Sequence, residues 1–352
     1  MSQSRAPRSP RLARPERGRR RTLGALGGAL ALLGLVSACS SGSGSLEQPN
    51  LTVGVVSGIG AAAFELGYAQ NDFSHAGLTI NIKPYPTDSA AESALKSGDI
   101  DIAFGDYSEF LSSSSATSLQ VVGEGYDAGA DTIGLVAPTT SSLTTDSLTG
   151  KSGVAALIAS GNLSVDVPDA SSPEYLALAN WAIAEQIPLQ QSTQRVNSVA
   201  NGANGPTTAT TEIKNVLSGA ASAAVLQDPY LTQAIESGQV TEVANLDSGN
   251  AADMPVSGYF TLRSTAQKDP NTIAAFQAAL SQAQALGSSR VQVEGALVSE
   301  QVSHEVAATT SIGNYPTGGI VAATLTNVLS LMSSANLPTS GLSAAALTGT
   351  DS

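Results

Sequence analysis

Residues 95–107 read Leu-Lys-Ser-Gly-Asp-Ile-Asp-Ile-Ala-Phe-Gly-Asp-Tyr, and this stretch indicates the class of fold. Gly98 follows the end of a helical pattern, and the apolar segment Ile100–Phe104 predicts a short buried strand. Asp106 and Tyr107 come directly after that strand. Ligands of open α/β sheets bind beyond the carboxyl ends of strands, so we expect Asp106 and Tyr107 at a binding site.

Strands and helices alternate on both sides of this stretch. Apolar segments of strand length are Leu51–Val56, Leu78–Tyr85, Ile100–Phe104, Leu119–Gly123 and Thr132–Ala137. Helical periodicity covers residues 63–73, the segment from Ser89 to Gly98 and a segment near 108–113. Ser89 and Glu92 have the spacing of a capping box. This alternation implies βαβ units and a mainly parallel sheet.

The second half of the chain repeats the plan. A helix is expected to begin after Ser172, a capping residue followed by proline, and Thr193–Val199 is a candidate strand. Next come a helix at Thr211–Leu217, a Ser-Gly stop, the apolar segment Ala220–Leu226, and a strand end carrying Asp228 and Tyr230. The order matches that of residues 95–107. We therefore expect two α/β lobes whose strand-end acidic residues face each other across one cleft.

A late strand at Ser257–Arg263 is expected to return the chain from the second lobe to the first. The Asp269-Pro270 pair then begins a helix that runs through Leu286. The sequence from Leu337 onward is rich in Ser, Gly, Thr and Ala, and we expect it to form a loose tail.

The N-terminal segment has the order of a lipoprotein signal peptide, residues 1–38. Three consecutive arginines precede the apolar run Leu23–Val36, which is too short to span a bilayer. Residues 36–39, Val-Ser-Ala-Cys, resemble a bacterial lipobox, in which the cysteine is lipidated. Cys39 is the only cysteine, which excludes an internal disulfide. Residues 39–48 would be a flexible tether, and export would use either the general or the twin-arginine route.

The charge of the chain is unevenly distributed. Residues 1–38 hold eight of the 16 basic residues and one of the 29 acidic residues. From Cys39 onward there remain eight basic and 28 acidic residues, a formal charge of −20. So acidic a surface repels nucleic-acid phosphates, and we expect no nucleic-acid partner.

Several motifs stand in a recognisable order. They are the lipobox, the 95–105 stretch, Leu-Thr-Gly-Lys at 148–151, Val-Leu-Gln-Asp-Pro-Tyr at 225–230, Ser-Gly-Tyr at 257–259 and the helix beginning at Asp269-Pro270. Together they resemble the substrate-binding lipoproteins of ABC importers, in the branch for nitrate, sulfonate, taurine and thiamine-pyrimidine precursors. The resemblance covers about residues 50–290. Asn71-Asp72 and Gln227 stand where the family often has Lys-Gly and Trp.

The resemblance implies an α/β type II periplasmic-binding-protein fold, with two lobes joined by two crossing strands. Lobe 1 would comprise residues 49–137 and 258–336, and lobe 2 residues 138–257, with the hinge near Thr132–Pro138 and Ser257–Arg263. The lobes would close on a small solute. It further implies a monomer without enzymatic activity, held at the outer face of the cell membrane by a lipid such as palmitate on Cys39. That monomer would deliver its solute to an ABC permease and its ATPase.

Ten residues at strand ends and helix starts are candidates for ligand contact. They are Ser57, Gly58, Ile59, Asp106, Tyr107, Tyr126, Ser171, Ser172, Tyr175 and Asp228. Backbone N–H groups at the Ser57–Ile59 turn can hold an anion or a polar ligand end. Each residue also has a structural alternative, such as helix capping by Asp106 or Asp228. Tyr230 is expected to pack in the helix beyond.

Other chemistries find little support in the sequence. His75 and His304 are isolated, so no metal site is predicted, and no cofactor-binding glycine motif or nucleophile elbow is present. The cleft candidates are Asp and Tyr, while Lys and Arg are scarce. We therefore favour a neutral or positively charged solute, such as a pyrimidine-like precursor. An enzyme on the same fold, or a lipoprotein that senses a ligand or assembles with partners without transport, remains an alternative.

Overall fold

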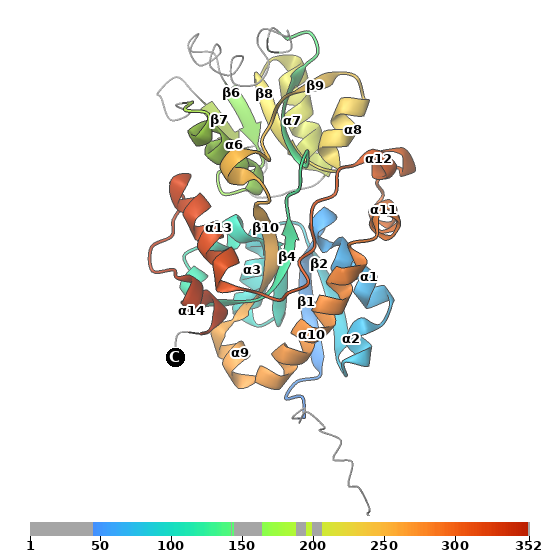
Figure 1. Ribbon diagram of the computed structural model, residues 1–352, viewed down its shortest axis with the longest axis vertical. Helices are drawn as coiled ribbons and strands as arrows, with labels where there is room; N and C mark the ends of the chain where they lie inside the picture. The colour runs from blue at the N-terminus through green and yellow to red at the C-terminus, as the bar shows by residue number, and fades with distance from the viewer. Residues whose placement is uncertain (1–44, 142, 144–163, 188–194, 199–205, 351–352) are drawn as a thin grey trace, which may run out of the picture. The chain divides into compact units, whose positions relative to one another are not determined.

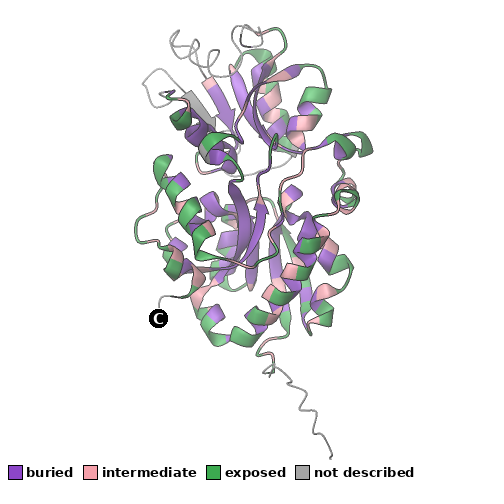
Figure 2. Ribbon diagram, in the orientation of Figure 1, coloured by how far each residue is buried: buried purple, intermediate pink, exposed green. Residues whose placement is uncertain are grey.

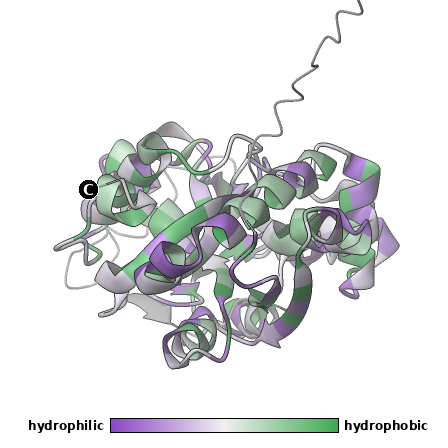
Figure 3. Cartoon of the chain, turned by 90° about the horizontal axis from the view of Figure 1, so that it is seen from below, coloured by the Kyte–Doolittle hydropathy of each residue, from purple (hydrophilic) through white to green (hydrophobic). Residues whose placement is uncertain are grey.

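The computed structural model describes residues 45–141, 143, 164–187, 195–198 and 206–350. The described residues from Ser45 onward belong to one compact unit. The predicted signal peptide, Cys39 and Lys151 lie outside the described residues. No described helix is long and apolar enough to cross a bilayer, and the helices in Figure 3 mix hydrophilic and hydrophobic stretches.

The first sheet combines strands from both ends of the body (Figure 1). Its order is β2-β1-β3-β10-β4, formed by Thr79–Tyr85, Asn50–Val56, Ile102–Asp106, Pro255–Leu262 and Leu119–Asp127. β1 is parallel to β2 and β3, but β10 is antiparallel to both of its neighbours. β4 therefore runs in the same direction as β1, β2 and β3, which confirms the predicted mainly parallel sheet, with β10 as its antiparallel strand. Apolar periodicity identified the return strand β10 but carries no information on its direction.

The second sheet has the same plan. Its order is β7-β6-β8-β5-β9, formed by Arg195–Ser198, Ser164–Val167, Ala223–Gln227, Ile133–Pro138 and Val240–Asn245. β5 is the antiparallel strand here, pairing with β8 and β9. β8 occupies the third position of its sheet, as β3 does in the first. The sequence echo between residues 95–107 and 217–230 therefore marks topologically equivalent units.

Helices cover both faces of the first sheet. The described α-helices are α1 (Ala62–Ala69), α2 (Asp72–His75), α3 (Asp88–Ser97), α4 (Tyr107–Ser112), α6 (Pro173–Ala184), α7 (Pro206–Ser218), α8 (Tyr230–Glu236), α9 (Arg263–Lys268), α10 (Pro270–Leu286), α11 (Arg290–Ser299), α12 (His304–Thr309), α13 (Ala322–Ser334) and α14 (Ala344–Thr348). On one face, α1, α2 and α10 enclose an aromatic cluster in which Phe64, Phe73, Tyr259 and Phe276 are fully buried. α3, α4 and α13 cover the other face. Figure 2 shows buried strands between helices with exposed outer surfaces.

Local capping chemistry sets several helix boundaries. The Ser172 hydroxyl accepts the N–H of Tyr175 at 3.2 Å, which confirms the predicted cap of α6. At α3 the cap is Thr87 rather than Ser89, because the Thr87 hydroxyl accepts the N–H of Ala90 at 3.0 Å. The helix expected over 63–73 divides into α1 and α2, because Asn71 has a left-handed backbone conformation with φ of 66°.

The two sheets are joined by residues 128–132 and 246–254. The Ala128 N–H donates to the Met254 carbonyl at 2.8 Å. The Asp247 carboxylate accepts the N–H groups of Thr132 and Ile133, each at 2.6 Å. The first crossing thus precedes Ile133, earlier than the expected boundary after Ala137, because β5 pairs in the second sheet.

The C-terminal end is packed rather than loose. The Ser343 hydroxyl caps α14 by accepting the N–H of Ala346 at 3.1 Å. Leu347 is completely buried where α14 packs on β4 and α13. Residues 337–350 therefore do not form the expected tail.

Candidate functional site

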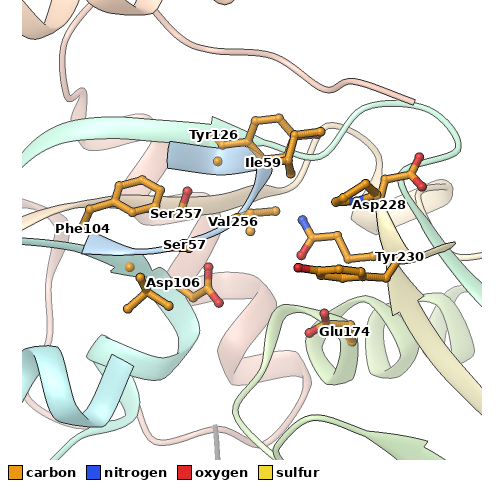
Figure 4. Close-up of a pocket in the computed structure, with 16 residues that line it drawn as sticks. Ser57, Ile59, Phe104, Asp106, Tyr126, Glu174, Asp228, Tyr230, Val256 and Ser257 are labelled. Atoms are coloured by element: carbon orange, nitrogen blue, oxygen red, sulfur yellow. The ribbon is translucent and has the colours of Figure 1, made fainter. Parts of the chain in front are cut away.

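A cavity lies between the carboxyl ends of β3 and β8 (Figure 4). Its lining comprises Val56, Ser57, Gly58, Ile59, Gly60, Phe104, Gly105, Asp106, Tyr126, Glu174, Gln227, Asp228, Pro229, Tyr230, Val256 and Ser257. In Figure 4, Asp106 and Ser257 lie on one side, and Glu174 and Tyr230 on the other. The centres of water molecules can occupy about 50 Å³ of it, room for only a few waters. A solute of more than a few atoms can enter only if the two sides move apart.

The turn after β1 forms one wall. Gly58 has a φ of 154°, which L side chains rarely adopt, and a Cβ there would meet no atom within 4 Å. Glycine thus leaves the backbone exposed to the cavity. The Glu300 carboxyl lies beside this turn, and its interaction with the Gly58 backbone lowers the pKa of Glu300 against the larger effect of burial. The acid beside it makes this turn a poor anion cradle.

The end of β3 presents Asp106. The Asp106 N–H donates to the buried Asp88 carboxylate at 2.8 Å, which fixes the strand end. Asp106 is the residue before α4, but its side chain makes no capping hydrogen bond. Tyr107 is 1% exposed and does not line the cavity, because its ring packs edge-on against Phe260 in the core.

The end of β8 presents Asp228, which is 3% exposed. Its Oδ1 accepts the Thr232 N–H at 2.8 Å, and its Oδ2 accepts the Ser311 N–H at 2.7 Å. Burial raises the pKa of Asp228 to about 6, while these hydrogen bonds oppose the rise. Asp228 therefore both lines the cavity and ties α8 to the C-terminal part of the chain.

A short segment, Ser311–Tyr315, contacts the cavity walls from behind; we call it the C-terminal strap. Besides the Ser311 bond to Asp228, its Gly313 N–H donates to the Tyr126 hydroxyl at 2.7 Å. The Tyr315 hydroxyl donates to the Ile59 carbonyl at 2.6 Å. Asn314 and Asp127 form a β-bridge with backbone bonds of 2.9 and 3.0 Å. The strap thus holds three cavity-lining residues that come from both sides.

The lining is acidic. Asp106, Glu174 and Asp228 contribute carboxylates, and no lysine or arginine lines the cavity among the described residues. The Ser257 side chain is 2% exposed, and its Oγ has no hydrogen-bond partner in the described part of the chain. A buried hydroxyl without a partner is costly, so Ser257 is a ready donor or acceptor for a solute.

The structure brings together six of the ten candidates chosen from the sequence. Ser57, Gly58, Ile59, Asp106, Tyr126 and Asp228 line the cavity, and Tyr107, Ser171, Ser172 and Tyr175 do not. Ser172 is buried as the cap of α6, and Tyr175 packs against the core. Ser171 lines a different cavity, described below. Ligand contact by any of them stays a prediction.

Four polar lining residues were not among those candidates: Glu174, Gln227, Tyr230 and Ser257. Tyr230 also packs partly against the core of the second sheet, as expected, but its ring reaches the cavity (Figure 4). Glu174 lies in the first turn of α6. Its position two residues after the Ser172 cap was the available signal, because helix starts and strand ends meet at the same edge of such sheets.

Metal binding finds no ready centre at this cavity. Within the described ranges, no group of three or more His, Cys, Asp or Glu side chains is arranged to hold a metal ion. His75 lies in α2 and His304 begins α12, both outside the cavity lining.

Behind the Gly58 turn, the side chains of Glu65 and Glu300 are hydrogen-bonded to each other. Burial, and then the neighbouring Glu65, raise the pKa of Glu300 to about 8, against its usual 4.5. Because the folded state holds this proton more tightly than the unfolded chain, the stabilisation is complete below about pH 4.5 and is lost as pH rises through about 8.

We therefore expect the unfolding midpoint in urea to fall between pH 5.5 and pH 8.5, and to fall less in Glu300→Gln. Part of the fall should persist in that variant, because burial also raises the pKa of Asp88 and of Glu109. Glu305→Gln, which replaces an exposed carboxylate on α12, is the control and should keep the dependence. An unchanged pH dependence in Glu300→Gln would show that the shared proton does not stabilise this region.

Comparison with known proteins supports the fold. No protein-family model and no curated sequence matches the chain. Among solved structures it resembles a ligand-binding component of an ABC-type import system from Staphylococcus aureus, with a TM-score of 0.64 and 14% identity, over 83% of this chain and 94% of that one.

It also resembles two proteins whose solutes are known. One is the periplasmic aliphatic sulphonate binding protein of Escherichia coli, with a TM-score of 0.61, 18% identity and coverage of 82% and 86%. The other is the periplasmic nitrate-binding protein of Synechocystis PCC 6803, with a TM-score of 0.60, 14% identity and coverage of 78% and 73%. These are the kinds of protein that the sequence motifs resemble. The chain has the periplasmic-binding-protein fold, with two α/β lobes around the cavity described above.

Proposed function

We propose that this protein is an extracytoplasmic receptor that binds a small organic solute between its lobes and delivers it to an ABC permease. The main support for this proposal is the cavity at the carboxyl ends of β3 and β8. The fold that holds it is similar to that of a ligand-binding component of an import system. The ends of topologically equivalent strands are where ligands of such sheets bind. The narrow cavity is consistent with a cleft that opens to admit its solute and closes on it.

The solute is neutral or positively charged. Three carboxylates and no basic side chain line the described cavity, and the Glu300 carboxyl lies beside the Gly58 turn. A nitrate or sulfonate would meet three carboxylates there and no basic side chain among the described lining residues. An amine, amidine or aminopyrimidine would instead pair with Asp106 or Glu174 and hydrogen-bond to Ser257 Oγ.

The test is a thermal-shift screen of the body that begins at Gly44, with nitrogen bases and amines in one arm and sulfonates and nitrate in the other. We expect only the first arm to raise the melting temperature. Ser257→Ala should weaken that shift without lowering the melting temperature of the free protein. The Ser257 hydroxyl has no hydrogen-bond partner in the described residues, so its removal leaves no other group unsatisfied. Ser288→Ala, at an exposed serine, should change neither the ligand-induced shift nor the melting temperature of the free protein. Stabilisation by sulfonate or nitrate would refute the charge assignment, and no response to either arm would refute the receptor.

We further propose that Cys39 carries the lipid that holds the receptor at the membrane. The tether ends before Leu46, earlier than the expected residue 48, because Leu46 packs against the core and the Gln48 N–H donates to the Thr272 hydroxyl at 3.0 Å. The support is the order of arginines, apolar run and lipobox-like residues in the sequence. Mass spectrometry of the mature N-terminus should find a diacylglyceryl group on Cys39. A mature chain that begins elsewhere, with an unmodified or absent Cys39, would exclude the anchor.

A further inference from the structure

A second cavity lies between α3, α4 and the residue that precedes the Ser172 cap of α6. The centres of water molecules can occupy about 200 Å³ of it. Its lining is Asp88, Ser89, Glu92, Glu109, Phe110, Ser112, Ser113 and Ser171. Three carboxylates and four hydroxyls thus line it, without any lysine or arginine among the described residues. The cavity offers a set of oxygen atoms, the ligands that hard cations prefer.

Two of these carboxylates, those of Asp88 and Glu109, each have one oxygen that accepts a hydrogen bond and one that does not. Asp88 is 2% exposed; its Oδ1 accepts the Asp106 N–H at 2.8 Å, and its Oδ2 is buried with no hydrogen-bond partner. Glu109 Oε2 accepts the Ser171 hydroxyl at 2.9 Å, and its Oε1 is also buried without a partner. The Ser112 hydroxyl is likewise buried without a hydrogen-bond partner in the described part of the chain. Orphaned buried oxygens are rare and call for a missing partner.

The negative charge of the third carboxylate, Glu92, is already balanced by a nearby lysine. Glu92 lies 3.6 Å from the Lys96 ammonium and accepts the hydroxyls of Ser113 and Ser115. Asp88 and Glu109, in contrast, face further acids. Burial, Glu109 and Glu174 raise the pKa of Asp88 to about 8, and burial, Asp169 and Glu174 raise the pKa of Glu109 to about 7. The acidic residues around this cavity thus come from both lobes.

We propose that this cavity binds a divalent cation of the calcium type, held by Asp88 and Glu109 with serine hydroxyls and waters completing its shell. Hard cations take oxygen ligands, and calcium accepts irregular coordination by carboxylates, neutral oxygens and water. A site with two carboxylates is a weak one, in the range of about 10⁻⁴ to 10⁻³ M that extracellular calcium modules show. Such a cation would neutralise the acids that meet at the lobe boundary.

The position of the site couples it to the solute cavity. Asp88 holds the backbone of Asp106, which lines that cavity, and Glu109 is bonded to Ser171, two residues before α6. α6 in turn carries Glu174 into the cavity. A cation at Asp88 and Glu109 would therefore stabilise the closed arrangement of the lobes, whatever the solute.

The test uses the body that begins at Gly44, at pH 8 and without solute. We expect CaCl₂ at about 10 mM to raise the melting temperature and to release protons into a weakly buffered solution. This concentration is roughly ten times the upper dissociation constant of about 10⁻³ M. Asp88→Asn and Glu109→Gln should each abolish both responses, and Glu305→Gln, at an exposed carboxylate, should retain them. At pH 5.5, where protons compete for the carboxylates, the calcium response should be much smaller.

Three results would overturn the proposal. One is the absence of any shift or proton release with CaCl₂ or MgCl₂ at pH 8. The second is a shift produced equally by NaCl or KCl at matched ionic strength, which would indicate screening rather than a divalent site. The third is a calcium response that persists in both variants. Because no solute is present, these outcomes are independent of whether the receptor function is correct.

Discussion

Replacing Asp228 by Ala is expected to abolish solute binding and to lower the free energy of unfolding by about 2–4 kcal/mol. The buried carboxylate accepts the N–H groups of Thr232 and Ser311 at 2.8 and 2.7 Å. Truncation leaves both donors without an acceptor, and each buried unsatisfied group costs roughly 1–3 kcal/mol. The loss also frees the C-terminal strap from the second lobe, which misplaces the cavity walls.

Asp228→Asn separates charge from hydrogen bonding. The amide keeps one acceptor oxygen, so stability should lie between wild type and Asp228→Ala, while affinity for a positively charged solute should fall about as far as in Asp228→Ala. Asp131→Asn is the matched control, since Asp131 is exposed and does not line the cavity. Asparagine also tolerates the left-handed backbone of residue 131, whose φ is 64°.

These variants can be followed through Trp181, the only tryptophan of the chain, which is 4% exposed in α6. Urea unfolding followed by the fluorescence of Trp181 gives the free energy of unfolding. Calorimetric titration with the solute found in the screen gives the dissociation constant. Wild-type affinity in Asp228→Ala would remove Asp228 from the binding site. Wild-type stability would show that the strap and α8 do not depend on it.

Local chemistry made much of the fold predictable from the sequence. The Ser-Gly stops followed by short apolar segments identified β3 and β8 and their equivalence, since each pattern is complete within about ten residues. The α6 cap at Ser172 was equally local. The direction of β10 was not predictable in this way, because a strand has the same side-chain periodicity in either direction.

The site was only partly predictable, because it depends on contacts between distant residues. Strand-end position led to Asp106, Tyr126 and Asp228. Nothing near Ser257 in the sequence shows that its hydroxyl lines the cavity. The bond from Tyr315 to the Ile59 carbonyl spans 256 residues. Tyr107 illustrates the opposite error, since a strand-end position does not tell which face of the sheet a side chain occupies.

Replacing Gly313 by Ala should destabilise the protein by about 1–3 kcal/mol, the usual cost of forcing extra volume into a packed site. A Cβ at this position would lie 2.1 Å from the Asp127 carbonyl oxygen and 2.8 Å from the Gly129 N, and backbone atoms cannot turn aside. The strap must therefore shift, which strains the Gly313 bond to the Tyr126 hydroxyl and the β-bridge between Asn314 and Asp127.

Gly318→Ala is the matched control, because it adds the same methyl group to the same connecting segment with no atom within 4 Å of the new Cβ. Its unfolding midpoint in urea should stay within the scatter of wild type. Since the strap reaches Ile59, Tyr126 and Asp228, Gly313→Ala should also weaken solute binding, although no strap residue lines the cavity. Equal midpoints for the two variants would mean that the strap yields freely, and it could then not be what fixes the cavity walls.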